Sequence, residues 1–321
     1  MRYLITGGAG FIGGHLTEAL LADENNEVVV IDDLSTGLMS NLSSVINDKR
    51  LKFVEADIVT MEDMDDHVKN VDVIYHLAAA VGVELVVNEP AQTIVTNVHG
   101  SENVINAAVK YNKRIIIAST SEVYGKSFKE KFSETDDLLI GCPTHSRWSY
   151  ACSKLLDEFY LMAHCHSHNL KGTVVRFFNT VGPRQTGQYG MVVPRFVASA
   201  LAGKDLSVYG TGTQSRCFCH VFDTIRALLA LTDCPESHGG IYNIGSHHRV
   251  SIEELAEIII KQLKSSSKIQ KISYDEAYEK GFEDMMHRAP DTTAIEALID
   301  WKTKLSLSDI INDVADSIQK K

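Results

Sequence analysis

A glycine-rich segment near the N-terminus constrains the fold of this chain more than any other sequence feature. The letters GGAGFIG at positions 7–13 directly follow a short apolar stretch, Arg2–Thr6, and open an amphipathic segment, Phe11–Leu21. At a strand–turn–helix junction, Gly7 permits the tight turn, Gly10 lets backbone N–H groups approach a pyrophosphate, and Gly13 allows close helix–strand packing. The spacing is GxxGxxG, and any strand–helix turn favours glycine, so a dinucleotide site needs a second indication.

Asp32 supplies that second indication. It ends the β-branched stretch Glu27–Asp32, 19 residues after Gly13. A carboxylate at this place can accept hydrogen bonds from the adenosine ribose hydroxyls and would repel a 2′-phosphate. The sequence therefore favours NAD over NADP as cofactor. The alternative is that Asp32 and Asp33 merely begin a polar turn.

Short apolar strands alternate with helical patterns through the first half of the chain. Such alternation is typical of parallel strands that are buried on both faces. It predicts an α/β fold with a Rossmann-type doubly wound parallel sheet. The expected strands are Arg2–Thr6, Glu27–Asp32, Leu51–Glu55, Asp72–Leu77, Arg114–Ser119 and Gly172–Phe177, and the expected long helices are Phe11–Leu21, Thr93–Val109 and Tyr150–His166.

The pattern changes after about Asn179, where we expect a smaller C-terminal α/β lobe that binds the substrate. Residues 1–178 would form the NAD-binding domain, with later segments near 217–245 interleaved into it, and residues 179–321 mainly the substrate lobe. Ser251 with an acidic first turn indicates a helix start. The other expected elements are a loop over Gly182–Pro194, strands Leu206–Tyr209 and Ile241–Ile244, and helices Arg195–Ala202, Asp223–Leu231, Thr292–Leu298 and Ser308–Ile318.

The charge balance excludes some classes of partner. With 31 basic and 42 acidic side chains, the formal net charge is −11. Binding to nucleic acid or to an anionic membrane surface needs a basic footprint, so we expect neither partner. No apolar run approaches the roughly 20 residues that span a bilayer, and the early glycines leave no room for a signal peptide. We therefore expect a cytoplasmic protein.

The six cysteines are scattered along the chain, which is not the pattern of a disulfide framework. Cys217 and Cys219 form a CxC without the second pair that a zinc site requires. We expect no metal site, and we place both side chains on one face of a strand, since residues two apart in a strand point the same way.

A group of reactive side chains follows the expected strand Arg114–Ser119. Thr120, Ser121 and Glu122 come directly after it, and Tyr150 and Lys154, four residues apart, share one face of a helix. Ligands of open α/β sheets sit at the carboxyl ends of the strands, so these groups would converge there. A tyrosine with a pKa of about 10 is a poor base, but a fixed cation and a positively charged nicotinamide favour its phenolate. A lone YxxxK pattern is weak evidence, because it usually marks a solvated helix face.

The whole set of motifs resembles the extended short-chain dehydrogenases/reductases that modify nucleotide sugars. The matching segments are GGAGFIG, Asp32, His76–Ala79 (HLAA), Asn97, STSEVYG, YACSK, FFNTVGPR at Phe177–Arg184, and Arg216. The resemblance implies that NAD is bound by Gly7, Gly10, Phe11, Ile12, Gly13, Asp32, Asp57, Ile58, Leu77, Ala78, Asn97, Tyr150 and Lys154. It implies the catalytic residues Thr120, Ser121, Glu122, Tyr150 and Lys154, the substrate ligands Arg147, Asn179, Arg216 and Arg288, and a homodimer built on a four-helix bundle.

Members of this family oxidise C4 of the sugar and then differ in the second step of the reaction. Glu122 suggests proton traffic at C5, and the guanidinium of Arg147 can clamp a carboxylate. The segments Arg147–Lys154, Gly281–Asp284 and His287-Arg288 are similar to UDP-glucuronate decarboxylases of the lipid-modifying kind and to UDP-apiose/UDP-xylose synthases. The stretch 185–195 is more like that of epimerases and dehydratases.

The expected function is therefore UDP-glucuronate decarboxylation, with 4-epimerisation of a UDP-sugar and then 4,6-dehydration as alternatives. A regulator that only senses NAD is the non-enzymatic alternative, and the intact Thr120, Tyr150 and Lys154 argue against it. Arg147 could instead form a salt bridge at a helix end, and Glu122 could be a solvated carboxylate at the end of a strand.

Overall fold

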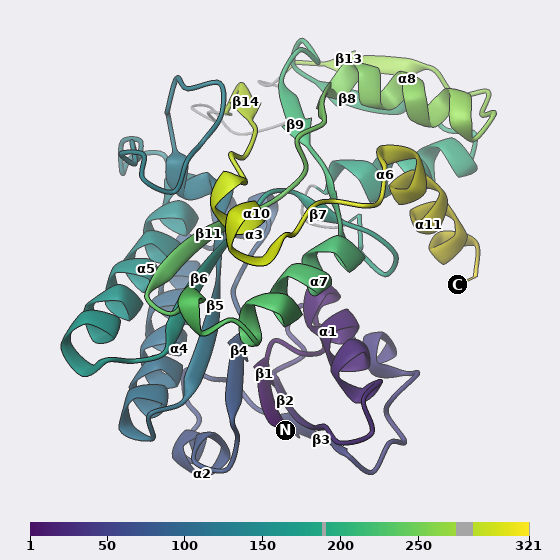
Figure 1. Cartoon of the computed structure of the whole chain (residues 1–321). Helices are drawn as coiled ribbons and strands as arrows, with labels where there is room; N and C mark the ends of the chain where they lie inside the picture. Colours follow the sequence, from purple (N-terminus) through teal and green to yellow (C-terminus); the bar gives the residue numbers. More distant parts are fainter. Residues whose placement is uncertain (188–190, 274–284, 321) are drawn as a thin grey trace.

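A seven-stranded parallel sheet forms the centre of the molecule (Figure 1). The computed structural model describes residues 1–187, 191–273 and 285–320. The strand order is β11-β6-β5-β4-β1-β2-β3, with every neighbouring pair parallel, so the predicted doubly wound fold is confirmed. The strands are β1 (Arg2–Thr6), β2 (Glu27–Asp32), β3 (Leu51–Glu55), β4 (Val73–His76), β5 (Arg114–Thr120), β6 (Gly172–Phe177) and β11 (Gly240–Ile244). The strand order reverses between β1 and β4, which opens a crevice at their carboxyl ends.

Helices cover both faces of this sheet and enclose two apolar cores. One core lies under α1, α7 and α10, and the other lies under α2, α4 and α5. Successive residues of β1 enter different cores: Tyr3 and Ile5 pack in the first and Leu4 in the second, as the two-residue period of a strand requires. These helices are α1 (Phe11–Leu21), α2 (Met64–Val68), α4 (Pro90–Lys110), α5 (Trp148–His168), α7 (Val221–Thr232) and α10 (Thr293–Ile299).

A smaller lobe with its own core lies above the carboxyl ends of the strands (Figure 1). In it α6, α8 and α11 pack around a parallel pair, β8 and β13, and near a three-stranded sheet in the order β12-β9-β14. Helix α8 begins at the predicted Ser251 cap, which exchanges hydrogen bonds with Glu254. The elements are α6 (Val192–Leu201), α8 (Ile252–Gln262), α11 (Leu307–Gln319), β8 (Leu206–Tyr209), β9 (Ser215–Cys217), β12 (Arg249–Ser251), β13 (Ile269–Ile272) and β14 (His287–Arg288).

The chain crosses between the two parts more than once. After β7 (Thr180–Val181) it enters the smaller lobe, and at β10 (Cys219–His220), which pairs with β7, it returns to the main sheet. Strand β11 then adds to the edge of β6, with Gly240 opposite Thr173. Residues from the second half of the sequence are therefore part of the sheet that carries the glycine turn.

Some local details of the structure differ from the expectations. Cys217 ends β9 and Cys219 begins β10, so the two buried thiols lie on different strands and not on one face of a single strand. Helix α6 starts at Val192, inside the expected loop, because Pro194 falls in the first turn, where its missing N–H has no helical partner to lose. A short helix, α3 (Val83–Asn88), was not expected in front of α4.

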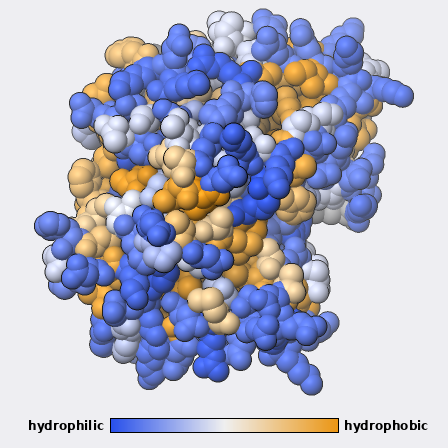
Figure 2. Space-filling model, in the orientation of Figure 1, coloured by the Kyte–Doolittle hydropathy of each residue, from blue (hydrophilic) through white to orange (hydrophobic). Residues whose placement is uncertain are grey.

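Polar residues cover most of the visible surface, and hydrophobic residues gather towards its middle (Figure 2). Within the described ranges, no helix is both long enough and apolar enough to cross a membrane. All six cysteines are free thiols.

Candidate active site

A cavity of about 680 Å³ lies at the carboxyl ends of the central strands, and residues of the smaller lobe, among them Arg195, Arg216 and Arg288, also line it. This volume falls in the ordinary range for ligand sites. The predicted site residues that line it are Gly7, Gly10, Phe11, Ile12, Gly13, Asp32, Asp57, Ile58, Leu77, Ala78, Thr120, Ser121, Glu122, Arg147, Tyr150, Lys154, Asn179, Arg216 and Arg288. The predicted segment Gly281–Asp284 lies outside the described residues.

The glycine turn has the shape that a bound pyrophosphate requires. Gly7 has a φ of +73°, and a Cβ there would lie 2.7 Å from the backbone nitrogen of Ala78. A Cβ on Gly13 would lie only 2.2 Å from the carbonyl oxygen of Gly7, so α1 approaches β1 as closely as the backbone allows. Gly10 precedes α1 without any side-chain cap, which leaves the first N–H groups of the helix for a ligand. The residues present therefore fit a dinucleotide.

Asp32 is buried at the end of β2, against the glycine turn. Its two carboxylate oxygens accept hydrogen bonds from the backbone N–H groups of Ala9 and Leu34, each at 2.9 Å. Burial raises the pKa of this carboxyl group, and the neighbouring Asp33 raises it further. Asp32 therefore does more than begin a polar turn: it lines the cavity and also holds the glycine turn in place.

Asn97 is the exception among the predicted cofactor ligands, because it does not line the cavity. Its Oδ1 accepts a hydrogen bond from the backbone of Ala80 at 2.8 Å, and its Nδ2 donates to Ser153 Oγ at 3.1 Å. The side chain is buried behind the loop that carries Ala80. It fixes the loop that forms one wall of the cavity.

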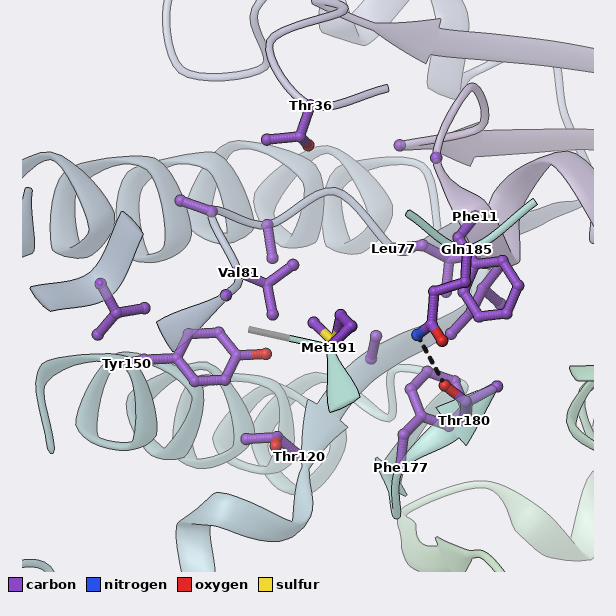
Figure 3. A pocket seen from close by; sticks show the side chains of 18 of the residues that line it. Phe11, Thr36, Leu77, Val81, Thr120, Tyr150, Phe177, Thr180, Gln185 and Met191 are labelled. Atoms are coloured by element: carbon purple, nitrogen blue, oxygen red, sulfur yellow. Dashed lines mark hydrogen bonds between the residues drawn. The ribbon is translucent and has the colours of Figure 1, made fainter. Parts of the chain in front are cut away.

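Tyr150 extends from α5 into the cavity, and Thr120 lies beside it at the end of β5 (Figure 3). Burial raises the pKa of the Tyr150 phenol, and the charges of Glu122 and Asp157 raise it further. A hydrogen bond with Thr120 and the charge of Arg288 act in the opposite direction. The pKa is raised on balance, because burial and the two carboxylates outweigh the hydrogen bond with Thr120 and the charge of Arg288.

Lys154 is almost fully buried one helical turn after Tyr150. Its Nζ donates a hydrogen bond to Asp157 Oδ2 at 2.8 Å, and both side chains are 2% exposed. Burial raises the pKa of Asp157, while the ammonium of Lys154 acts to lower it. Asp157 was not predicted, because an acidic residue three places after a lysine in a helix is ordinary on a solvated face.

Two arginines from different elements meet at Glu122. Glu122 lies in η2 (Ser121–Tyr124), where its backbone N–H donates to Thr120 Oγ1. Arg288 Nη1 lies 3.2 Å and Arg147 Nη2 lies 3.8 Å from the same carboxylate oxygen, Glu122 Oε1. The structure therefore joins three predicted residues into one charged cluster beside Tyr150. Glu122 is neither solvated nor alone, and Arg147, which precedes α5, faces the cavity.

The remaining predicted substrate ligands lie on the side of the smaller lobe. Arg216 and Arg288 are register partners on the parallel strands β9 and β14, so their guanidinium groups enter the cavity from neighbouring positions. Arg216 also donates to the carbonyl oxygens of Ser215 and Met285. Asn179 donates from Nδ2 to the carbonyl oxygen of Cys217 at 3.1 Å, which ties its loop to β9.

Arg184 also lines the cavity. It ends the FFNTVGPR segment, but the sequence predicted no role for it. Its guanidinium pairs with Glu18 at 2.6 Å and donates to the carbonyl oxygen of Asn41 at 2.8 Å. It also contacts His15, whose pKa burial lowers to about 4. Ser317 of α11 accepts from the backbone N–H of Arg184. The cluster joins the smaller lobe to α1, and only the fold brings its members together.

Comparison with known proteins gives a consistent assignment. Residues 4–314 match the family model described as GDP-mannose 4,6 dehydratase. The chain is 40% identical over 309 residues to a UDP-N-acetyl-alpha-D-glucosaminuronate decarboxylase of Bacillus cytotoxicus, covering 95% of this chain and 94% of the relative. It is 33% identical to UDP-glucuronic acid decarboxylase 6 of Arabidopsis thaliana, covering 96% and 85%.

Among solved structures, a UDP-glucuronic acid 4-epimerase variant of Bacillus cereus, with a substrate analogue and NAD, superposes with a TM-score of 0.89 at 27% identity, covering 100% of this chain and 99% of that one. The cavity, its motifs and these similarities lead to one conclusion. The chain belongs to the GDP-mannose 4,6-dehydratase family of extended short-chain dehydrogenases/reductases.

Proposed function

We propose that this chain is an NAD-dependent decarboxylase of a UDP-linked hexuronic acid. The observation that carries the proposal is the cluster of Arg147, Glu122 and Arg288 beside Tyr150. A neutral sugar needs no guanidinium group such as that of Arg147 near its ring, whereas the C5 carboxylate of a uronic acid binds well to one. The Bacillus cytotoxicus and Arabidopsis relatives, both decarboxylases of UDP-uronic acids by name, support the same reaction.

The glycine turn, Asp32 and the first turn of α1 would hold the NAD. Asp57, Ile58, Leu77 and Ala78 would form the wall along the adenosine half, and Lys154 would lie at the nicotinamide half. When bound, NAD supplies the acceptor for the C4 hydride of the sugar.

Tyr150 would accept the proton of the C4 hydroxyl. In the structure the phenol is held protonated by burial and by the charges of Glu122 and Asp157, so its deprotonation awaits additional positive charge in the cavity. Thr120 keeps the phenol oxygen in place through a hydrogen bond, and Lys154 adds positive charge one turn along α5. These residues orient the hydroxyl and take its proton.

Arg147 would bind the C5 carboxylate of the sugar. Once C4 is a ketone, that carboxylate belongs to a β-keto acid: the C5–C6 bond breaks, CO₂ leaves, and the electron pair forms an enolate at C4–C5. Glu122 would relay a proton from solvent to C5 in place of the lost CO₂, because it lies at the cavity wall beside Tyr150. Asn179, Arg216 and Arg288 would hold the diphosphate, which assigns sugar-nucleotide binding mainly to residues 179–321 and NAD binding to residues 1–178.

An NMR time course tests this proposal. The protein with NAD is given UDP-glucuronate and UDP-N-acetylglucosaminuronate in separate samples. We expect release of CO₂ and a UDP-pentose, or its 4-keto form, from at least one of them. Formation of a UDP-hexuronate inverted at C4, without CO₂, would replace decarboxylation by 4-epimerisation, the activity named for the superposed Bacillus cereus enzyme. No reaction with either substrate would overturn the proposal.

We also propose that the protein is a homodimer through α4 and α5. These two helices pack side by side, and each exposes large apolar side chains: Ile94 and Val95 are 44% and 38% exposed on α4, and Leu156 and Phe159 are 51% and 66% exposed on α5. Leu156 and Phe159 are three residues apart and share one helix face. Pairing α4 and α5 of two copies into a four-helix bundle would cover this surface.

Light scattering tests the assembly. We expect a dimer for the native sequence and a monomer for Phe159→Lys. Phe128→Lys is the matched control, because Phe128 is 97% exposed and belongs to neither helix. A monomeric native protein would contradict the dimer.

The free thiols of all six cysteines are in keeping with a cytoplasmic location, which cell fractionation would test.

A further inference from the structure

Asp157 is a buried charge that does not line the cavity and exchanges no proton in the proposed reaction. It lies on α5 one turn beyond Lys154, is 2% exposed and accepts a 2.8 Å hydrogen bond from the Lys154 ammonium. Ser101 of α4 also bonds to its carboxylate. Neither partner is at the surface, so the carboxylate is enclosed between α4 and α5.

The bonds around Asp157 extend to the glycine turn in one consistent direction. A carboxylate only accepts, so Ser101 must donate to Asp157, and Ser101 Oγ then accepts from His76 Nε2–H at 2.9 Å. His76 Nδ1 is therefore the acceptor for the Thr6 hydroxyl, at 2.7 Å. Burial and the charge of Lys154 lower the pKa of His76 to about 3, in agreement with this neutral tautomer.

The far end of this chain of bonds meets the cofactor turn. Thr6 Oγ1 accepts from the backbone N–H of Ala78, the atom that leaves no room for a Cβ on Gly7. Thr6, His76 and Ser101 thus each donate in the direction of Asp157, whose carboxylate accepts from both Ser101 and Lys154. The Asp157 carboxylate therefore ends a buried series of hydrogen bonds that begins at the glycine turn, and it also accepts a hydrogen bond from Lys154.

We propose that Asp157 is a positioning residue of the redox site. It anchors the Lys154 ammonium, and its negative charge offsets the effect of that ammonium on the ionisation of the Tyr150 phenol. The inference rests on the redox role proposed for Tyr150 and Lys154. Through this offset the phenol stays protonated until additional positive charge arrives in the cavity.

The other charges near the phenol are distinct from Asp157 in position. Glu122 approaches it from η2 and Arg288 from β14, and Arg147 contacts Glu122 from the start of α5. Asp157 itself is flanked by Lys154 and Glu158 on its own helix and by His76 on β4 through Ser101. Glu158 is already paired with Arg176 at 2.7 Å, so it does not replace Asp157.

A titration of Tyr150 tests the inference without any sugar substrate. The phenolate absorbance of the NAD-loaded protein is followed with pH, and the same titration of Tyr150→Phe is subtracted to isolate this one phenol. Asp157→Asn is expected to move the midpoint to lower pH, since it removes a negative charge that opposes phenolate. Asp157→Glu, which keeps the charge, is expected to return the midpoint towards that of the native protein.

A surface pair of the same spacing provides the control. Asp66 and Lys69 form an exposed pair at α2, also three residues apart, at 2.6 Å. Asp66→Asn is expected to leave the Tyr150 midpoint unchanged. Should Asp157→Asn fail to fold, Asp157→Ser removes the same charge from a smaller side chain and carries the same expectation. A midpoint that is unchanged or higher in the folded neutral variant would overturn the proposal.

The rate of sugar oxidation gives a second measurement. In Asp157→Asn the acid limb of the kcat profile is expected to move to lower pH, in step with the titration, while the KM for NAD changes less than threefold. A purely structural role would lower the melting temperature without moving either midpoint. If no UDP-sugar is turned over, the proposed function fails, but the titration still decides the role of Asp157.

Discussion

The role of Arg147 gives the sharpest test of uronic acid recognition, through the variant Arg147→Gln. The guanidinium is 5% exposed and lies 3.8 Å from Glu122, in a cluster largely screened from water. A hydrogen bond to a charged group in such surroundings contributes about 1.5–3 kcal/mol. At about 1.4 kcal/mol for each factor of ten, kcat/KM for the uronic acid is expected to fall roughly 10- to 150-fold.

The comparison substrate makes this test specific. UDP-glucose has the same ring and nucleotide without the C5 carboxylate, so its dissociation constant, measured by calorimetry, is expected to change less than threefold in Arg147→Gln. Arg2→Gln is the matched control, because Arg2 and Glu27 form an exposed arginine–glutamate pair at 2.9 Å, far from the cavity. Equal weakening of both ligands, or an unchanged kcat/KM for the uronic acid, would refute carboxylate recognition by Arg147.

Three further variants probe the proton acceptor, the glycine turn and the buried histidine. Tyr150→Phe removes the proton acceptor and is expected to lower kcat about 10²- to 10⁴-fold with unchanged NAD binding, and an active Phe variant in a stopped assay would contradict that role. Gly13→Val places a Cβ 2.2 Å from the Gly7 carbonyl oxygen and is expected to abolish NAD binding and lower the melting temperature. The pKa of His76 falls from 6.5 to about 3 on folding, so the stability that its neutral form provides is complete above pH 6.5 and is lost as the pH falls towards 3. Urea unfolding at several pH values measures how the free energy of unfolding changes with pH. Between pH 3 and 6.5 this slope is expected to be smaller by about 1.4 kcal/mol per pH unit in His76→Gln than in the native protein, and an equal slope would refute the assignment.

Much of the main domain was predictable because its signals are local. Strand β1 and helix α1 have the predicted bounds, since an apolar run, a glycine turn and a helical period occupy adjacent residues. The cofactor turn was predictable from the same short segment. Helix α6 shows the limit of such patterns, because Pro194 indicates a loop unless its position within the first helical turn is known.

The chemistry of individual residues was less predictable. The spacing of Tyr150 and Lys154 indicates that a cation lies near the phenol. It does not indicate that burial and the charges of Glu122 and Asp157 raise the pKa of the same phenol. Burial and distant charges are properties of packing, which no local pattern records.

The sequence by itself determined the alternation of strands and helices, the glycine turn with Asp32, and the inventory of reactive side chains. Only the tertiary structure decided which of them act together. Glu122 and Arg288 are 166 positions apart, and they meet because β14 pairs with β9 above the carboxyl end of β5. Asp157 became a buried anchor because α4 and the main sheet close over its side of α5. Spacing along a chain constrains neighbours within a few residues, whereas contacts between separate elements are set by the packing of the cores that join them.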